Sequence, residues 1–147
     1  VLAQDYEMFE VHTPCRLVKH EYLPDSAGPG RWRGGLGVET EFVVEGEGVT
    51  GICFGDGVDE EARAFGLFGG GGGALNRLEL RTPAGEVIIP RSKDVVPIPR
   101  GTIFWQQAGG GGGYGDPRQR PAETVAAEVR DGLISPEAAR RDYGIET

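Results

Sequence analysis

GGGGGALN (69–76) and GGGGGYGDP (109–117) each place five consecutive glycines inside one chain of 147 residues. Neither run contains serine, and bulky residues precede both: FGLF (65–68) leads into the first, and Phe104 and Trp105 stand before the second. Holding a glycine in a regular element lowers the stability of the fold by roughly 0.5–1 kcal/mol relative to alanine, because glycine loses the most backbone freedom on folding. Anchored runs of this kind predict ordered segments whose packing leaves no room for side chains, rather than a flexible linker.

Two uses of such runs can be weighed from the residues. A phosphate-binding loop of the type G-x-x-x-x-G-K-[ST] needs a lysine and a hydroxyl that neither run supplies, and YGDPRQRP (114–121) interrupts the helix that should follow the second run. Close packing of extended polyproline-II segments needs only glycine, as at the axis of collagen. The proline-rich stretch 23–37 favours the same extended geometry, so we expect these segments to lie side by side, with only some glycines facing inward.

The remainder of the first 117 residues reads as short β-strands. The patterns predict an imperfect strand over 9–23, a hairpin over 37–56 with EGEG as its turn, a second hairpin over 76–90 with TPAG as its turn, and a strand over 102–107. Prolines at 97 and 99 favour an edge or an extended segment over 95–101. We therefore expect a mainly β fold of short antiparallel strands and hairpins, in a barrel-like or sandwich-like arrangement.

Residues 118–147 have a different pattern, which predicts two short helices. The first follows Pro121 and ends at Gly132, and the second has Ser135 as its N-cap, Pro136 at its first position and Gly144 as its C-cap. Helices of about ten residues are marginal alone, so we expect this tail to pack on the β-rich domain (1–117) or on a partner.

Composition bounds the class of protein. The net charge of −8 argues against nucleic acid or an anionic membrane as a partner, since both attract clusters of Lys and Arg. The chain has no apolar stretch of about 20 residues and does not begin with a signal-peptide pattern, so a cytoplasmic protein is expected. Its two cysteines, Cys15 and Cys53, are then expected to be free thiols.

The sequence offers several candidate sites, and each has a plainer interpretation. Arg31, Trp32 and Arg33 could bind an anion, but we favour Trp32 as a core residue and the arginines as partners of acidic residues. The acidic loop 55–63 lacks the spacing of a calcium loop, so a solvated loop is favoured. The few serines and histidines offer no local catalytic framework.

Four residues carry zinc-binding atoms: His12, Cys15, His20 and Cys53. On an extended strand His12 and Cys15 point to opposite faces, so ordinary packing is favoured over a metal site. The sequence therefore predicts no metal site and no cofactor site in this chain, and it does not identify a catalytic residue.

Taken together, four motifs resemble a known family. DSAGPGRWRGGLGVE, GLFGGGGGALN, GGGGYGDP and RPAETVAAEVRDGLISPEAARRDYGI occur in the order seen near the C-terminal end of hydantoinase B/oxoprolinase proteins. The resemblance covers residues 14–145, and the departure is length, because members of that family have several hundred residues. The chain resembles their C-terminal portion.

The resemblance implies a division of labour within a hetero-oligomer. Large hydantoinase A-type and hydantoinase B-type subunits would be the partners, with ATP and a divalent metal bound in the complex. This chain would be a structural or site-completing subunit of an ATP-dependent carboxylase acting on an aromatic ketone. The alternatives are a subunit of a hydantoinase-type or oxoprolinase-type amidohydrolase, or an independent module that binds a small ligand.

Overall fold

The structure is a computed structural model that describes residues 5–146, and these residues group into two compact units. Of the described residues, the first unit takes in 5–21, 39–55 and 78–106, and the second takes in 22–38, 56–77 and 107–146. Each unit is built from three separate stretches of the chain. The predicted division at residue 117 stays a prediction.

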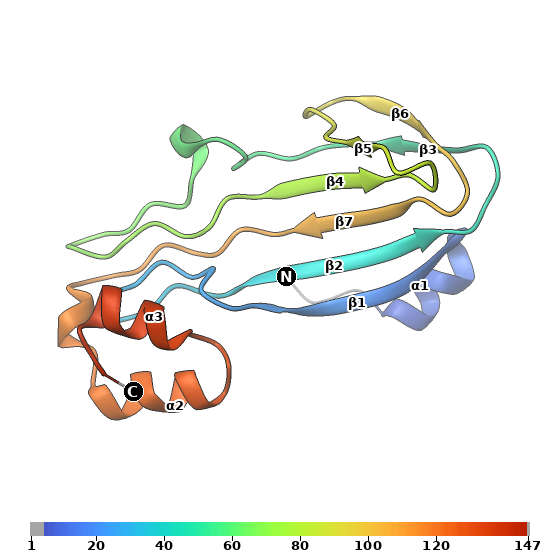
Figure 1. Ribbon diagram of the computed structural model, residues 1–147. Coiled ribbons are helices and arrows are strands. Elements are labelled where there is room, and N and C mark those ends of the chain that lie inside the picture. The colour runs from blue at the N-terminus through green and yellow to red at the C-terminus, as the bar shows by residue number, and fades with distance from the viewer. Residues whose placement is uncertain (1–4, 147) are drawn as a thin grey trace. The chain divides into compact units, whose positions relative to one another are not determined.

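A five-stranded sheet supplies most of the first unit (Figure 1). Its strands, in spatial order, are β1 (Cys15–Leu23), β2 (Gly37–Val44), β7 (Ile103–Gln107), β4 (Arg77–Arg81) and β5 (Val87–Ile88). The order leaves β1 and β5 as edges, so the sheet is open rather than closed into a barrel. The mainly β class predicted from the sequence is confirmed.

A separate two-stranded antiparallel sheet joins β3 (Val49–Ile52) to β6 (Val95–Ile98). The predicted hairpin over 37–56 is therefore wrong in its pairing, although both strands exist: β2 lies between β1 and β7, while β3 pairs with β6. Pro97 lies opposite Thr50 in the two-stranded sheet, in agreement with the predicted edge or extended segment. A strand of so small a sheet leaves one side unpaired, which accommodates a residue without an N–H.

The second predicted hairpin is confirmed. β4 and β5 are antiparallel, with Leu80 opposite Ile88, and the amide of Thr82 donates to the carbonyl of Glu86 across the turn. Gly85 has a φ of 85°, a conformation that explains glycine at the end of TPAG.

Residues predicted as the start of the first strand form a helix instead. The helix α1 spans Tyr6–His12, and the Asp5 side chain accepts hydrogen bonds from the amides of Glu7 and Met8. An Asp cap with an acidic residue in the first turn is a helix start signal, which outweighs the weak alternation at 9–12. The strand β1 begins only after Pro14.

The core of the first unit is small. Val44, Leu80 and Ile98 are buried, and the rings of Phe42 and Phe104 stack with their centroids 4.4 Å apart. These residues come from β2, β4, β6 and β7, so both sheets contribute to one cluster.

The second unit contains the C-terminal helices predicted from the sequence. They are α2 (Ala122–Arg130), α3 (Pro136–Ala138) and the π-helical turn η3 (Ala139–Tyr143), and two 3₁₀ turns, η1 (Glu60–Ala62) and η2 (Pro117–Gln119), belong to the same unit. The Ser135 hydroxyl accepts from the amide of Ala138, and Gly144 ends the last turn in a left-handed conformation, as predicted. A buried cluster holds the helices together: Val125, Ile134, Ala138, Ala139 and Tyr143.

Candidate functional site

Three extended glycine-rich segments of the second unit lie side by side without forming regular strands (Figure 1). We call 109–115 the central segment, 26–35 the first flanking segment and 64–73 the second flanking segment. Backbone hydrogen bonds join them: Gly28 donates to Gly111, which donates to Gly35, and Gly113 donates to Gly71, at 2.8 to 2.9 Å. Both glycine runs are thus ordered by neighbouring backbone, as the sequence predicted.

Glycine is required at most positions of the central segment because backbone occupies the space of a side chain. A Cβ on Gly109, Gly110, Gly112 or Gly113 would lie less than 3.0 Å from a backbone carbonyl oxygen of a neighbouring stretch. The oxygens belong, in that order, to Ala74, Ser26, Phe65 and Pro29. A rigid carbonyl cannot rotate aside as a side chain can, so these positions exclude every larger residue.

Gly111 is the exception within the run. A Cβ there would meet its nearest neighbour, the backbone nitrogen of Gly35, at 3.1 Å, with the next atoms at 3.8 Å. The expectation that the five positions differ is supported: Gly111 is the least crowded position, although it also faces neighbouring backbone, and the other four approach backbone more closely.

Reciprocal contacts show that the flanking segments have the same requirement. A Cβ on Gly70 would clash with the carbonyl of Gly113, and one on Gly73 would clash with the carbonyl of Gly110. On the other side, a Cβ on Gly34 would clash with the carbonyl of Gly111. The central segment therefore lies between two chains that approach it at backbone contact distance.

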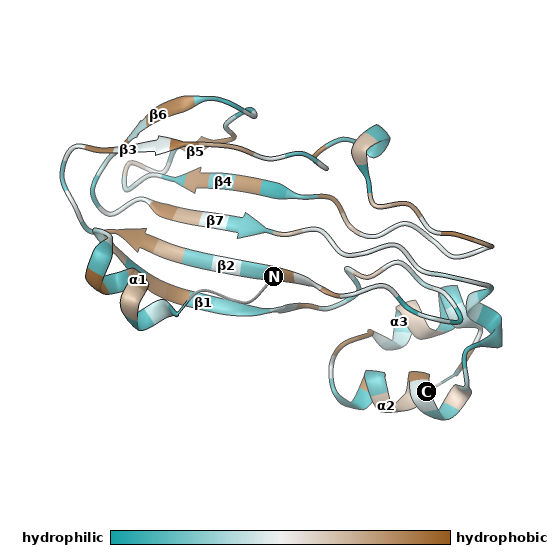
Figure 2. Cartoon of the chain, turned by 180° about the vertical axis from the view of Figure 1, so that it is seen from behind, coloured by the Kyte–Doolittle hydropathy of each residue, from teal (hydrophilic) through white to brown (hydrophobic). Residues whose placement is uncertain are grey.

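One end of this array carries four exposed apolar side chains, which we call the aromatic tip: Trp32, Leu67, Phe68 and Tyr114. Trp32 and Tyr114 exchange backbone hydrogen bonds of 3.0 and 2.9 Å, and Leu67 forms a bridge with Tyr114. The rings of Phe68 and Tyr114 lie 5.1 Å apart. In Figure 2 hydrophobic colour marks the loop that follows η1, which contributes two of the four residues.

Phe68 has an unusual backbone for a bulky residue. Its φ is 52°, in the left-handed region, and it precedes Gly69 in a tight turn closed by a 3.0 Å hydrogen bond from Gly70 to Leu67. The left-handed conformation costs an L-residue roughly 1–2 kcal/mol, and an aromatic side chain there does not reduce that cost. Phe68 is also 76% exposed, so burial does not compensate for the strain.

The predicted role of Trp32 as a core residue is wrong, because Trp32 is 64% exposed. Its ring instead faces the Arg31 guanidinium, whose carbon lies 5.9 Å from the ring centroid. Trp32 is held outward because its own backbone pairs with Tyr114 at the end of the central segment.

Arg33 does pair with an acidic residue, as predicted. Its Nε donates to Glu128 of α2 at 2.9 Å, and Arg120 donates to both oxygens of the same carboxylate at 2.8 and 3.1 Å. The three side chains are only 10 to 16% exposed. Arg120 also donates to the carbonyl of Arg31, so this cluster attaches helix α2 to the first flanking segment.

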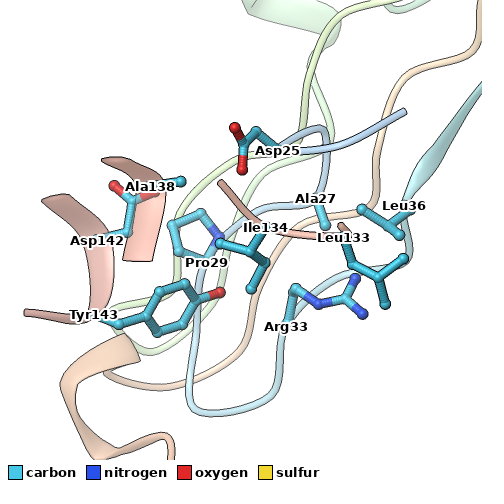
Figure 3. A pocket seen from close by; sticks show the side chains of 10 residues that line it. All are labelled: Asp25, Ala27, Pro29, Arg33, Leu36, Leu133, Ile134, Ala138, Asp142 and Tyr143. Carbon is cyan, nitrogen blue, oxygen red and sulfur yellow. The ribbon is translucent and has the colours of Figure 1, made fainter. Parts of the chain in front are cut away.

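A small, partly open cavity lies beside this cluster, lined by Arg33, Tyr143, Ile134 and Asp25 among others (Figure 3). Its volume of about 10 Å³ is at the lower limit for one water molecule, so it cannot hold a substrate. Burial raises the pKa of Tyr143, an effect that the positive charge of Arg120 opposes. The phenol is thus kept protonated, as expected of a structural side chain.

A larger and more open concavity, of about 370 Å³, lies along the acidic loop and the central segment. Gly57, Asn76 and Gly109 contribute to it, and the Asn76 amide bridges two of its walls by donating to the carbonyl of Asp56 and accepting from the amide of Gly109. Arg63, at the end of the predicted acidic loop, donates to the carbonyl of Gly73 at 2.5 Å. The loop therefore supports the second flanking segment.

The four residues considered as zinc ligands lie in different environments. His12 lies on α1 rather than on a strand, and His20 is hydrogen-bonded to Tyr6 and Thr40. Cys15 and Cys53 are free thiols whose pKa is raised by burial. Within residues 5–146 no group of three His, Cys, Asp or Glu side chains is arranged to hold a metal ion.

The roles of several residues were not identified from the sequence: Phe68, Tyr114, Glu128 and Tyr143. Two of them had a visible signal, because Phe68 directly precedes the first glycine run and Tyr114 directly follows the second. The roles of Glu128 and Tyr143 depend on contacts between segments far apart in the chain. Across the described part of the chain, no helix combines the length and apolarity that crossing a membrane requires.

A model of the hydantoinase B/oxoprolinase family matches residues 1–117 of this chain. The beta chain of caprolactamase from Pseudomonas jessenii is 33% identical over 156 residues, which cover 99% of this chain and 25% of that protein. A candidate D-/L-hydantoinase of Pseudomonas sp. (strain NS671) has a B-type component that is 30% identical over 144 residues, which cover 95% of this chain and 23% of that protein.

Solved structures show the same fold. The crystal structure of ATP-dependent caprolactamase from Pseudomonas jessenii matches 99% of this chain with a TM-score of 0.83 at 27% identity, over 26% of its own length. The nucleotide-free structure of acetone carboxylase matches 96% of this chain with a TM-score of 0.79 at 22% identity, over 23% of its length. The chain thus spans about a quarter of the proteins that it matches.

Proposed function

Because the chain belongs to the hydantoinase B/oxoprolinase family, we propose that it is a structural or site-completing part of an ATP-dependent, multi-subunit enzyme. The observation that carries this proposal is the glycine array with its aromatic tip. It is a rigid support built from backbone contacts, and the small cavity beside Arg33 has room for little more than a water molecule.

ATP binding is assigned to a partner. Phosphate-binding glycine loops direct free amide N–H groups at the ligand. Here the amides of Gly71, Gly111 and Gly113 donate to carbonyls of neighbouring segments. The glycine array therefore does not fit a nucleotide phosphate, and the lysine of a phosphate loop is missing from both runs. We propose that ATP and an accompanying divalent metal are bound by a hydantoinase A-type partner.

A cyclic amide is the substrate class that we propose first. Two of the relatives are at least 30% identical to this chain, and their names refer to caprolactam and to hydantoins. Both compounds contain an amide within a ring. In such an enzyme the role of this chain would be to complete the hydantoinase B-type body around the site.

Carboxylation of an aromatic ketone, as by acetophenone carboxylase, is the second candidate. It is supported by the order of the four motifs in residues 25–145, which resembles the C-terminal portion of hydantoinase B/oxoprolinase proteins, and the acetone carboxylase structure shares the fold. The third possibility, an independent small-ligand module, has the open concavity beside Asn76 as its observation.

One set of assays separates the three candidates. The protein is purified with all its native partners and incubated with bicarbonate, with and without ATP, and with caprolactam, a hydantoin, acetophenone or acetone. We expect ATP-dependent ring opening of a cyclic amide. ATP-dependent carboxylation of a ketone would select the second candidate, and an active, monodisperse monomer would exclude complex membership.

A further inference from the structure

The aromatic tip combines exposure with rigidity. Its four side chains lie at the end of an array whose backbone is fixed by hydrogen bonds, among them Leu67 to Gly113 and Gly115 to Leu67, both 2.9 Å. A preorganised surface loses little conformational freedom when it binds, which favours affinity. Tryptophan and tyrosine are also the residues that most often contribute the binding energy of protein interfaces.

We propose that the aromatic tip is the docking surface for the part of the hydantoinase B-type fold that this chain does not include. The proposal rests on the proposed function, since it takes the family body as the partner. It names the contact residues, which the family match alone does not.

The length of the relatives identifies the occupant. This chain covers 25% of the caprolactamase beta chain and 26% of the solved caprolactamase chain, so about three quarters of the family fold lies outside it. All four residues of the tip lie within residues 1–117, which the family model matches. A surface that belongs to the shared fold is therefore expected to contact the remainder of that fold, in the same polypeptide or in another one.

The backbone of Phe68 supports the same conclusion independently. Residues in strained conformations persist where something other than local stability requires them, and they concentrate at ligand clamps and switch regions. Glycine or asparagine would relieve the strain at this exposed position. A phenylalanine that is both strained and exposed instead directs a ring outward beside Tyr114, where a partner can bury it.

Because the backbone of Phe68 is strained, a substitution by glycine can remove the ring without an expected loss of stability. Phe68→Gly removes the ring and relieves the left-handed backbone, so the purified protein should keep or raise its thermal midpoint. Where the hydantoinase B-type body is a separate polypeptide, its association should weaken by at least tenfold, as for an aromatic hot spot; where it is the same polypeptide, the crosslink described below decides. Lys93→Gly is the matched control, because Lys93 has a φ of 72° and lies in the first unit. We expect that control to change association by less than twofold.

A crosslink identifies the occupant. A photoreactive phenylalanine analogue replaces Phe68 in the native, assembled protein, and the crosslinked peptides are identified by mass spectrometry. Peptides from the hydantoinase B-type body support the proposal, whether they belong to the same polypeptide or to a separate one. Peptides from a second copy of this chain or from an ATP-binding partner, the lack of any crosslink, or unchanged association of Phe68→Gly would each overturn it.

The two proposals can fail separately. If ATP-dependent activity is found in the assembled protein while the crosslink maps elsewhere, the docking surface is wrong and the proposed function stands. If the assembled protein has no ATP-dependent activity on any of the substrates but the crosslink maps to the hydantoinase B-type body, the proposed function is wrong and the docking surface stands.

Discussion

At the scale of single residues, the glycines of the central segment are unequal, and an alanine scan should show it. Gly110→Ala, Gly112→Ala and Gly113→Ala each place a Cβ within 3.0 Å of a backbone carbonyl. Overpacking of this kind costs about 1–3 kcal/mol, or more where backbone must move. We expect the thermal midpoint to fall by about 2–4 °C for each kcal/mol lost in a chain of this size.

Gly111→Ala is the internal control for that scan, because its nearest neighbour would lie at 3.1 Å. We expect the smallest loss of the five positions, because the Gly35 backbone has to give way by only a few tenths of an ångström and alanine reduces the freedom of the unfolded chain by about 0.4–1 kcal/mol. Equal losses at all five positions, or the largest loss at position 111, would contradict the contacts described above.

Sequence reasoning could predict that the glycines are packed, but it could not predict which one is the least crowded. Collagen-like geometry suggests a fixed period, yet the central segment contacts separate stretches on several sides. The least crowded position depends on where those stretches lie, which the local sequence does not encode.

Tyr143 should make stability sensitive to alkaline pH. Burial raises the pKa of this phenol, so its contribution to stability is complete below the ordinary tyrosine pKa of about 10 and is lost as the pH rises through the folded value. Tyr143→Phe keeps the packing and removes the ionisation. Urea unfolding between about pH 9 and about pH 11 should show a shallower decline for the variant than for the wild type. Parallel declines would argue against this assignment.

At the scale of elements, the carboxylate of Glu128 attaches helix α2 to the first flanking segment, since it pairs with both Arg33 and Arg120. Glu128→Gln would leave two buried guanidinium groups without an anion. Removing one partner from a buried pair costs about 3–5 kcal/mol. We expect a loss of that order in the free energy of unfolding, measured by urea denaturation.

An exposed pair provides the comparison for Glu128. Arg16 and Glu45 also lie 2.9 Å apart, but their side chains are 54% and 52% exposed. Exposed ion pairs contribute about 0–1 kcal/mol, so Glu45→Gln should have a small effect. Similar losses for the two variants would mean that burial does not decide the contribution of Glu128.

Elements were predictable from the sequence where their signals are local. The TPAG turn placed the β4–β5 hairpin correctly, and the Ser135-Pro136 start and Gly144 end placed the last helical turns. The EGEG turn was misleading because β2 pairs with β1 and β7, while β3 pairs with β6. A turn sequence permits a hairpin, but the competing partners decide whether it forms.

At the scale of the whole molecule, this chain should not bind ATP by itself. Calorimetry with magnesium-ATP on the isolated chain should give no submillimolar binding, because the glycine amides already donate to backbone and the net charge is −8. The assembled protein, under the same conditions, is the positive control. Submillimolar binding to the isolated chain would overturn the assignment of ATP to a partner.

Membership of the family could be predicted from four motifs, whereas the substrate could not. The motifs encode the glycine array and the helices packed against it, which are features of the shared fold. Substrate choice depends on side chains that line a site, and three quarters of the related proteins lie outside this chain. The residues described here therefore identify the family and its fold, but not the substrate.

The contacts of the glycine array also limit how this sequence can change in evolution. A clash between two side chains can be relieved by a smaller residue at the second site, but Gly34, Gly73 and Gly110 each face a carbonyl oxygen. Every residue type carries that oxygen, so no substitution elsewhere restores the lost space. A second substitution therefore cannot compensate for a side chain at these positions, and only reversion to glycine removes the clash.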